Sequence, residues 1–219
     1  MSRRTIGEWF DEGNHALEEE VGWLLNKWYV REAHFVAPRM KREGLKVVRE
    51  FGCRSGLLVR SLALLVPDMS YRGSEMSQKL LRMARERVAD MRGVDIELHN
   101  ACAEEKVDLA IAFSHFKHVP LETWVDAVCS VLRLGRFAAF DVQTLDHELD
   151  NGVDYPHVYA TEAMVAQAVA AAGHEVVDRE VWHEGTLPEH GTMRDVAFWT
   201  RSSSSAAGEE APHLGPGGD

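Results

Sequence analysis

Short strand-like runs alternate with helical stripes along the chain from residue 45 to residue 200. This alternation predicts an α/β fold, because consecutive parallel strands need a helical crossover between them. The sheet is expected to be mostly parallel and to carry helices on both faces. The expected strands are 45–51, 71–76, 95–98, 107–113, 136–142, 174–182 and 194–200.

The helical stripes have recognisable starts and stops. Ser77 and Thr161 are suited to cap the first turn of a helix, because their hydroxyls accept hydrogen bonds from unpaired backbone N–H groups. Gly135 and Gly173 stand where a helix would end. The expected helices of this part of the chain are 57–65, 77–88, 124–132 and 161–173.

The chain divides into three parts by its patterning. An amphipathic stripe over residues 14–30 predicts an N-terminal helix, so residues 1–43 are assigned to a helical cap. Residues 44–201 form the α/β domain. Residues 202–219 are rich in Ser, Ala, Gly and Pro, and are expected to be a disordered tail because they offer little apolar surface to bury.

Charge and hydropathy exclude several classes of function. The 219 residues carry a formal charge of -11, which would repel a phosphate backbone, so no nucleic-acid partner is expected. The longest aliphatic run, 62–66, is too short to cross a bilayer, so no membrane partner is expected either.

The three cysteines, Cys53, Cys102 and Cys129, include no Cys-x-x-Cys pair, and no two histidines show the spacing typical of metal ligands. We therefore expect neither disulfides nor a metal site. A chain of this kind fits the reducing cytoplasm.

A glycine loop and a later carboxylate form the most informative pair of signals. Gly52 and Gly56 lie between the first strand and its helix, where the backbone can approach a ligand at the helix N-terminus. Glu75 follows Gly52 by 23 positions, at the end of the second strand. This is about where nucleotide-binding α/β folds place a carboxylate for ribose hydroxyls.

Over residues 44–201 the chain resembles the class I S-adenosylmethionine-dependent methyltransferases, particularly their small-molecule branch. The matching segments are Glu50-Phe51-Gly52-Cys53-Arg54-Ser55-Gly56, similar to the family's glycine loop, Tyr71 to Ser77, 108–120, and Leu132 to Phe137. The resemblance implies a Rossmann-like sheet of seven strands, the last antiparallel to the others, and S-adenosylmethionine as cofactor. The cofactor-binding residues that it implies are Glu50, Gly52, Cys53, Arg54, Gly56, Glu75, Met76 and Cys102.

The chain departs from the family pattern at several positions. Arg54 stands where the glycine loop has its middle glycine, and Cys102 stands where an Asp usually holds the adenine amino group. The sequence leaves three interpretations of Arg54 open: its side chain faces solvent, pairs with the cofactor carboxylate, or fills the methionine pocket. Arg49 replaces an apolar strand residue, and Lys117 replaces a common Glu.

Acceptor-side residues are expected outside the carboxyl ends of the strands. His118, Asp141 and Tyr155 are the candidate catalytic residues, with Gln143 beside them, and His118 also suits a packing role. The sequence thus predicts methyl transfer to a small-molecule acceptor. A catalytically silent, partner-binding protein and an enzyme with changed chemistry are the alternatives.

Overall fold

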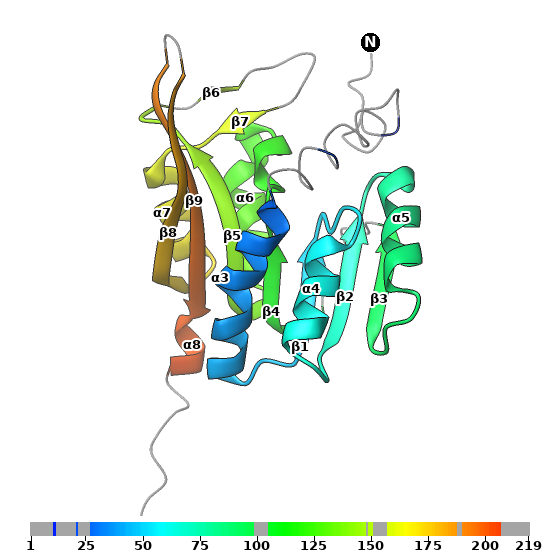
Figure 1. The fold of residues 1–219 in the computed structure, drawn as a ribbon. Coiled ribbons are helices and arrows are strands. Elements are labelled where there is room, and N and C mark those ends of the chain that lie inside the picture. The colour runs from blue at the N-terminus through cyan, green and yellow to red at the C-terminus, as the bar shows by residue number, and fades with distance from the viewer. Residues whose placement is uncertain are drawn as a thin grey trace, which may run out of the picture.

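The computed structural model of the chain describes residues 27–98, 105–147, 149–150, 157–187 and 190–206, together with the single residues Asp11 and Val21. These residues form one large mixed sheet with helices packed on it (Figure 1). A second sheet pairs β6 (Leu149–Asp150) with β7 (Val158–Tyr159), and a bridge between Ala160 and Thr144 joins it to the large sheet.

The large sheet has seven strands in the order β3-β2-β1-β4-β5-β9-β8. Neighbouring strands from β3 to β5 are parallel, whereas β9 is antiparallel to both β5 and β8. The predicted seven-stranded, mostly parallel sheet is therefore confirmed, including its antiparallel last strand. The strands are β1 (Val47–Phe51), β2 (Ser70–Glu75), β3 (Val94–Leu98), β4 (Val107–Ala112), β5 (Gly135–Thr144), β8 (His174–Leu187) and β9 (Gly191–Ser202).

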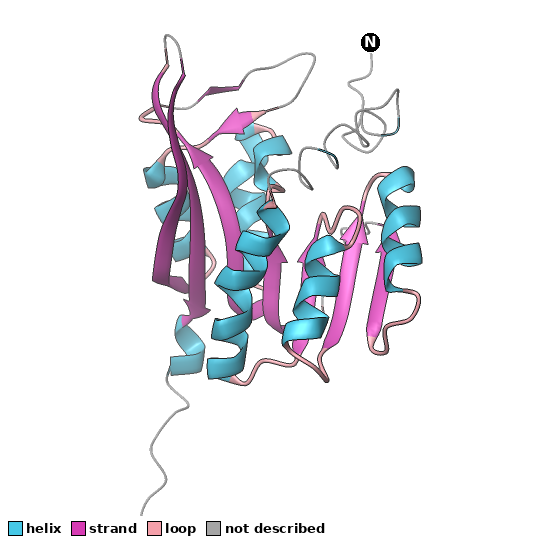
Figure 2. Ribbon diagram, viewed as in Figure 1, coloured by secondary structure: helices cyan, strands magenta, loops and turns pink. Residues whose placement is uncertain are grey.

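Helices cover both faces of the sheet, as expected. In Figure 2, α3 (Trp28–Glu43), α4 (Leu57–Leu65) and α5 (Gln78–Val88) lie in front of the strands, and α6 (Leu121–Leu132) and α7 (Glu162–Ala171) lie behind them. Two short helical segments, η1 (Phe116–His118) and α8 (Ser203–Ala206), complete the described elements.

The two layers of helices enclose two apolar cores. The first core lies under α3, α4 and α5, and joins Phe35, Phe113 and Trp182, whose rings meet at centroid distances of 5.3–6.4 Å. The second lies under α6 and α7 and includes Trp124 and Phe140. Since the central strands are buried on both sides, their near-continuous apolar runs are what a covered parallel sheet requires.

The helix starts read from the sequence are confirmed. The Ser77 hydroxyl accepts a hydrogen bond from Leu80 N (3.2 Å), and the Thr161 hydroxyl accepts one from Met164 N (3.2 Å). Gly173 adopts the left-handed conformation after α7, with φ of 74°. Each hydroxyl satisfies one of the N–H groups that a helix leaves unpaired in its first turn.

The described N-terminal helix is not the one expected from the sequence. The expected helix, 14–30, lies almost entirely outside the described residues, whereas α3 runs from Trp28 to Glu43 through Pro38. The α3 side chains Val36 and Met40 are fully buried in the first core, so this helix shares the core of the α/β domain. The cap boundary at residue 43 remains a prediction.

Regular secondary structure extends beyond residue 201, where the α/β domain was expected to end. Ser202 still pairs with His174 in the sheet, and Ser203 N donates to Gly173 O (2.9 Å) at the start of α8. Backbone hydrogen bonding thus extends the ordered chain past residue 201. The disorder expected further on, over 207–219, concerns residues outside the described part.

Candidate active site

The loop between β1 and α4 lies at the carboxyl edge of the sheet and takes an unusual backbone path. Gly52, Arg54 and Gly56 all have positive φ, at 70°, 51° and 76°. The N–H groups of Gly52 and Cys53 donate to Ser74 O on β2 (2.8 and 3.0 Å). Arg54 therefore adopts the left-handed conformation that a glycine would adopt at no steric cost, and that costs other residues roughly 1–2 kcal/mol.

Glu75 ties β2 to this loop. Its Oε2 accepts a hydrogen bond from Arg54 N (2.8 Å), and its Oε1 accepts from Met76 N (2.8 Å) and Ser77 N (2.9 Å). Burial raises the pKa of Glu75, and these N–H groups oppose the rise. A carboxylate has about four acceptor sites, so Oε2 keeps one for a further donor.

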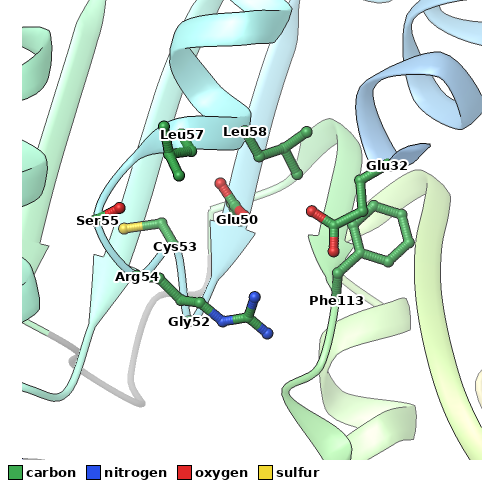
Figure 3. Close-up of a pocket in the computed structure, with 9 residues that line it drawn as sticks. All are labelled: Glu32, Glu50, Gly52, Cys53, Arg54, Ser55, Leu57, Leu58 and Phe113. Atoms are coloured by element: carbon green, nitrogen blue, oxygen red, sulfur yellow. The ribbon is translucent and has the colours of Figure 1, made fainter. Parts of the chain in front are cut away.

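A small cavity lies beside the loop (Figure 3). Its volume is about 10 Å³, about the volume that one water molecule needs. The Arg54 side chain extends from the loop toward the opposite wall, where α3 supplies Glu32 and the end of β4 supplies Phe113. The residues that line it are Glu32, Glu50, Gly52, Cys53, Arg54, Ser55, Leu57, Leu58 and Phe113.

Two carboxyl groups of this cavity are buried. Glu32 is 2% exposed and Glu50 is 4% exposed. Burial raises the pKa of Glu50 to about 8 although the positive charge of Arg54 opposes the rise. Burial likewise raises the pKa of Glu32 well above its usual range. No described residue forms a hydrogen bond with Glu50 Oε2.

Further along the same edge, Asp141 on β5 faces the loop after β4. Asp141 Oδ1 accepts a hydrogen bond from Ser114 N, and Asp141 Oδ2 accepts one from the Ser114 hydroxyl (3.4 Å). Burial raises the pKa of Asp141, while the Ser114 N–H and the charges of Arg54 and Lys117 oppose the rise.

A second carboxyl on β9 lies near Asp141. Asp195 is 4% exposed, and its Oδ1 has no hydrogen-bond partner within the part of the chain that the structure describes. Burial, and next the negative charge of Asp141, raise the pKa of Asp195 to about 8. The pair thus places two carboxyl groups, one from a parallel strand and one from the antiparallel strand, at the acceptor side of the edge.

The histidines of this side come from two segments. His118 ends η1 and its ring lies 6.5 Å from that of His157, centroid to centroid. The His157 ring donates from Nε2 to Gln143 Oε1. The predicted acceptor-side residues His118, Asp141 and Gln143 therefore do lie along one edge of the sheet.

The outer rim next to Glu75 is held by a contact from far along the chain. Asp11 accepts hydrogen bonds from the Ser77 hydroxyl (2.7 Å), Gln78 N (3.0 Å) and Lys79 N (3.2 Å). A carboxylate at this position is stabilised by the unpaired N–H groups of the first turn of α5.

Most of the predicted cofactor residues come together in the structure. Glu50, Gly52, Cys53 and Arg54 line the cavity, Gly56 precedes α4 as its cap, and Glu75 and Met76 join the loop through hydrogen bonds. Cys102 and Tyr155 lie outside the described residues. The binding roles of all these residues remain predictions.

Sequence reasoning missed three side chains of the site: Glu32, Ser114 and Asp195. Glu32 carried a detectable signal, since it stands at helical spacing with the apolar Phe35 and Val36. Asp195 carried none, because a polar residue near one end of a strand is ordinary. Only the pairing of β9 with β5 brings it to the site.

Within the described ranges, no group of three or more His, Cys, Asp or Glu side chains is arranged to hold a metal ion. Among the helices described, none has both the length and the apolar character needed to span a membrane.

Comparison with known proteins identifies the architecture. Residues 48–136 match the family model described as a methyltransferase domain. A search of curated proteins by sequence finds no match.

Solved structures match over most of the chain. Magnesium protoporphyrin IX methyltransferase from Synechocystis PCC 6803, with bound S-adenosylmethionine, matches with a TM-score of 0.68 at 14% identity, over 90% of this chain and 95% of that one. An S-adenosylmethionine-dependent methyltransferase from Clostridium acetobutylicum ATCC 824 matches with a TM-score of 0.66 at 10% identity, over 87% of this chain and 99% of that one. The [4+2]-cyclase SpnF matches with a TM-score of 0.61 at 16% identity, over 78% of this chain and 80% of that one. At these identities the likeness establishes a shared fold.

Proposed function

We propose that the chain is a class I methyltransferase, and that it transfers a methyl group from S-adenosylmethionine to a small-molecule acceptor. The observation that carries the proposal is the joining of Glu75 to the glycine-type loop through its contact with Arg54 N. This contact puts a carboxylate for ribose hydroxyls and a loop for the methionyl part at one sheet edge.

The residues fit the nucleoside end of this cofactor. Glu75 Oε2 keeps one acceptor site for a ribose hydroxyl, while both acceptor sites of Oε1 are taken by Met76 N and Ser77 N. We therefore expect one ribose hydroxyl, rather than two, to bind Glu75 directly unless the loop shifts.

The methionyl end fits only after a side-chain movement. The cavity of about 10 Å³ is too small for an amino acid moiety while Arg54 points into it. The positive charge of Arg54 opposes the raised pKa of Glu32 and of Glu50, so its guanidinium loses this electrostatic interaction when it swings out. Cofactor binding is therefore expected to be coupled to the position of Arg54.

When bound, the cofactor supplies an electrophilic methyl group on its sulfonium. The chain supplies alignment and exclusion of water. Asp141, fixed by Ser114, is suited to orient the acceptor, and His118 stands near enough to the same edge to accept a proton if the acceptor binds protonated.

The direct test is calorimetric titration with S-adenosylmethionine and S-adenosylhomocysteine, followed by incubation with methyl-labelled cofactor and small-molecule acceptors. Saturable binding and label in a small-molecule product support the proposal. No binding of either compound would contradict it and favour the silent, partner-binding alternative.

A changed chemistry on this fold is the second candidate, and the match to SpnF, which is described as a [4+2]-cyclase, is the observation behind it. Binding of the cofactor without transfer of label, together with a rearranged acceptor, would favour that candidate. For location we propose the cytoplasm, which suits the free thiols of Cys53 and Cys129.

A further inference from the structure

Four carboxyl groups from four different elements meet along the carboxyl edge of the sheet. Burial dominates the raised pKa of Glu32; the positive charge of Arg54 opposes the rise, and the charges of Asp141, Glu50 and Asp195 add to it. All four are at least 94% buried. Such a cluster is costly unless protons or cations neutralise it.

Two members of this cluster, Glu50 and Asp195, each have a buried oxygen without a hydrogen-bond donor among the described residues. In Asp195 this oxygen is Oδ1. On β9, Asp195 stands opposite Gln143 of β5, next to the acceptor side of the edge. A buried acceptor atom without a donor costs about 1–3 kcal/mol, more when it is charged, so a native site that keeps one calls for an explanation.

The cations near Asp195 do not satisfy it. Lys117 on η1 and Arg31 on α3 act on Asp195 through their charges, against the like charge of Asp141 on β5. Among the described residues, neither forms an ion pair with Asp195 within 4.0 Å, and Arg31 Nη1 donates to Trp182 O (2.6 Å). Asp195 Oδ1 can therefore accept a bond from a further donor that carries positive charge.

We propose that Asp195, together with Asp141, binds the ammonium group of the acceptor, so that the acceptor is an aliphatic amine. This inference rests on the proposed function only where it calls the amine a methyl acceptor. Binding of the amine itself is measured independently of methyl transfer. A neutral hydroxyl would form no ion pair with the ionised carboxylate of Asp195, and a carboxylate acceptor would be repelled by Asp195 and Asp141.

The proton on Asp195 makes amine binding depend on pH, which a residue with a merely structural role would not do. Below its pKa of about 8, Asp195 holds a proton that must leave before the carboxylate can pair with an ammonium. Amine affinity should therefore rise with pH by up to about tenfold per unit below that value, and binding should release protons.

The experiment is calorimetric titration of the full chain with three amines and the alcohols of the same skeleton: butylamine and 1-butanol, phenethylamine and 2-phenylethanol, tryptamine and tryptophol. Each titration is run with and without saturating S-adenosylhomocysteine, at pH 6.5 and pH 7.5, in two buffers that differ in ionisation enthalpy. We expect at least one amine to bind about tenfold tighter than its alcohol, with proton release. The pH slope should be positive.

The variant Asp195→Asn should lose the preference for the amine and the pH slope, while it keeps its affinity for S-adenosylhomocysteine. Glu184→Gln is the matched control, because Glu184 is an exposed carboxylate on the neighbouring strand β8. It should behave like the original chain.

Two results would overturn the inference: amines that bind no tighter than their alcohols in all three pairs, or an Asp195→Asn protein that keeps the pH slope. The first result needs only the unmodified chain, so a variant that fails to fold cannot protect the inference. Failure of S-adenosylhomocysteine to bind would contradict the proposed function instead, and the titrations without it would still decide the amine site.

Discussion

Replacing Glu50 with Gln should change how stability depends on pH, because Glu50 is a buried acid with an unpartnered oxygen. Its pKa is about 8 in the folded chain, against an ordinary value of 4.5. The folded state therefore holds a proton that the unfolded state releases. The sign follows from linkage: the stabilising contribution is complete below pH 4.5 and is lost as the pH rises through 8.

The size of the effect follows from the same two values. At pH 7, about 2.5 pH units above the ordinary pKa, the folded chain still holds the proton and the unfolded chain has released it. The free energy of unfolding at pH 7 is therefore lower than at pH 4.5 by at most about 3 kcal/mol. The variant Glu50→Gln has no such proton to lose. Its free energy of unfolding, relative to that of the original chain, should thus rise by up to about 1.4 kcal/mol per pH unit between pH 5 and pH 7.

Urea unfolding at pH 5, 6 and 7 measures this difference, provided that the m-values of the two proteins agree. Glu184→Gln, which removes an exposed carboxylate, should show no comparable trend. A difference between Glu50→Gln and the original chain that stays flat across this range would refute the reasoning and indicate that Glu50 titrates near its ordinary value.

Three other changes test the remaining assignments. Arg54→Gly should tighten S-adenosylhomocysteine binding by at least about tenfold, because it removes the side chain that fills the cavity and suits the left-handed backbone; weaker binding by calorimetry would instead identify Arg54 as a cofactor ligand. Glu75→Ala should weaken that binding about tenfold or more and also lower Tm, since three backbone N–H groups lose their acceptor; unchanged affinity in a folded variant would exclude the ribose role. Truncation after Ala206 should leave Tm unchanged within error, because residues 207–219 offer little apolar surface, and a drop of several degrees would show that they dock.

Much of the fold could be predicted because its signals are local. Strand β4 has its apolar run, and Ser77 and Thr161 cap α5 and α7 as their side-chain chemistry predicts. The α3 helix was missed because Pro38 and several charged residues interrupt its apolar stripe, although a proline is tolerated where tertiary packing outweighs the lost hydrogen bond.

The site was predictable only in part, for a similar reason. The glycine loop and Glu75 are recognisable because a fixed spacing along the chain positions them. Asp195 and Glu32 come to the same edge through strand pairing and helix packing over long separations, which residue spacing does not encode. Their altered acidity arises from burial, and burial is known only once the fold is known.

The position of β9 has a consequence for how this protein forms during synthesis. It is the last of the seven strands in chain order, yet it lies inside the sheet between β5 and β8. As the nascent chain emerges, β1 to β5 can pair while one edge of β5 remains unpaired. An unpaired strand edge can form hydrogen bonds with the wrong strand. Asp195 arrives with β9, so the acceptor side of the site is assembled last. A nascent chain stalled before residue 195 could pair only the five parallel strands β1 to β5, because β8 joins the sheet through β9.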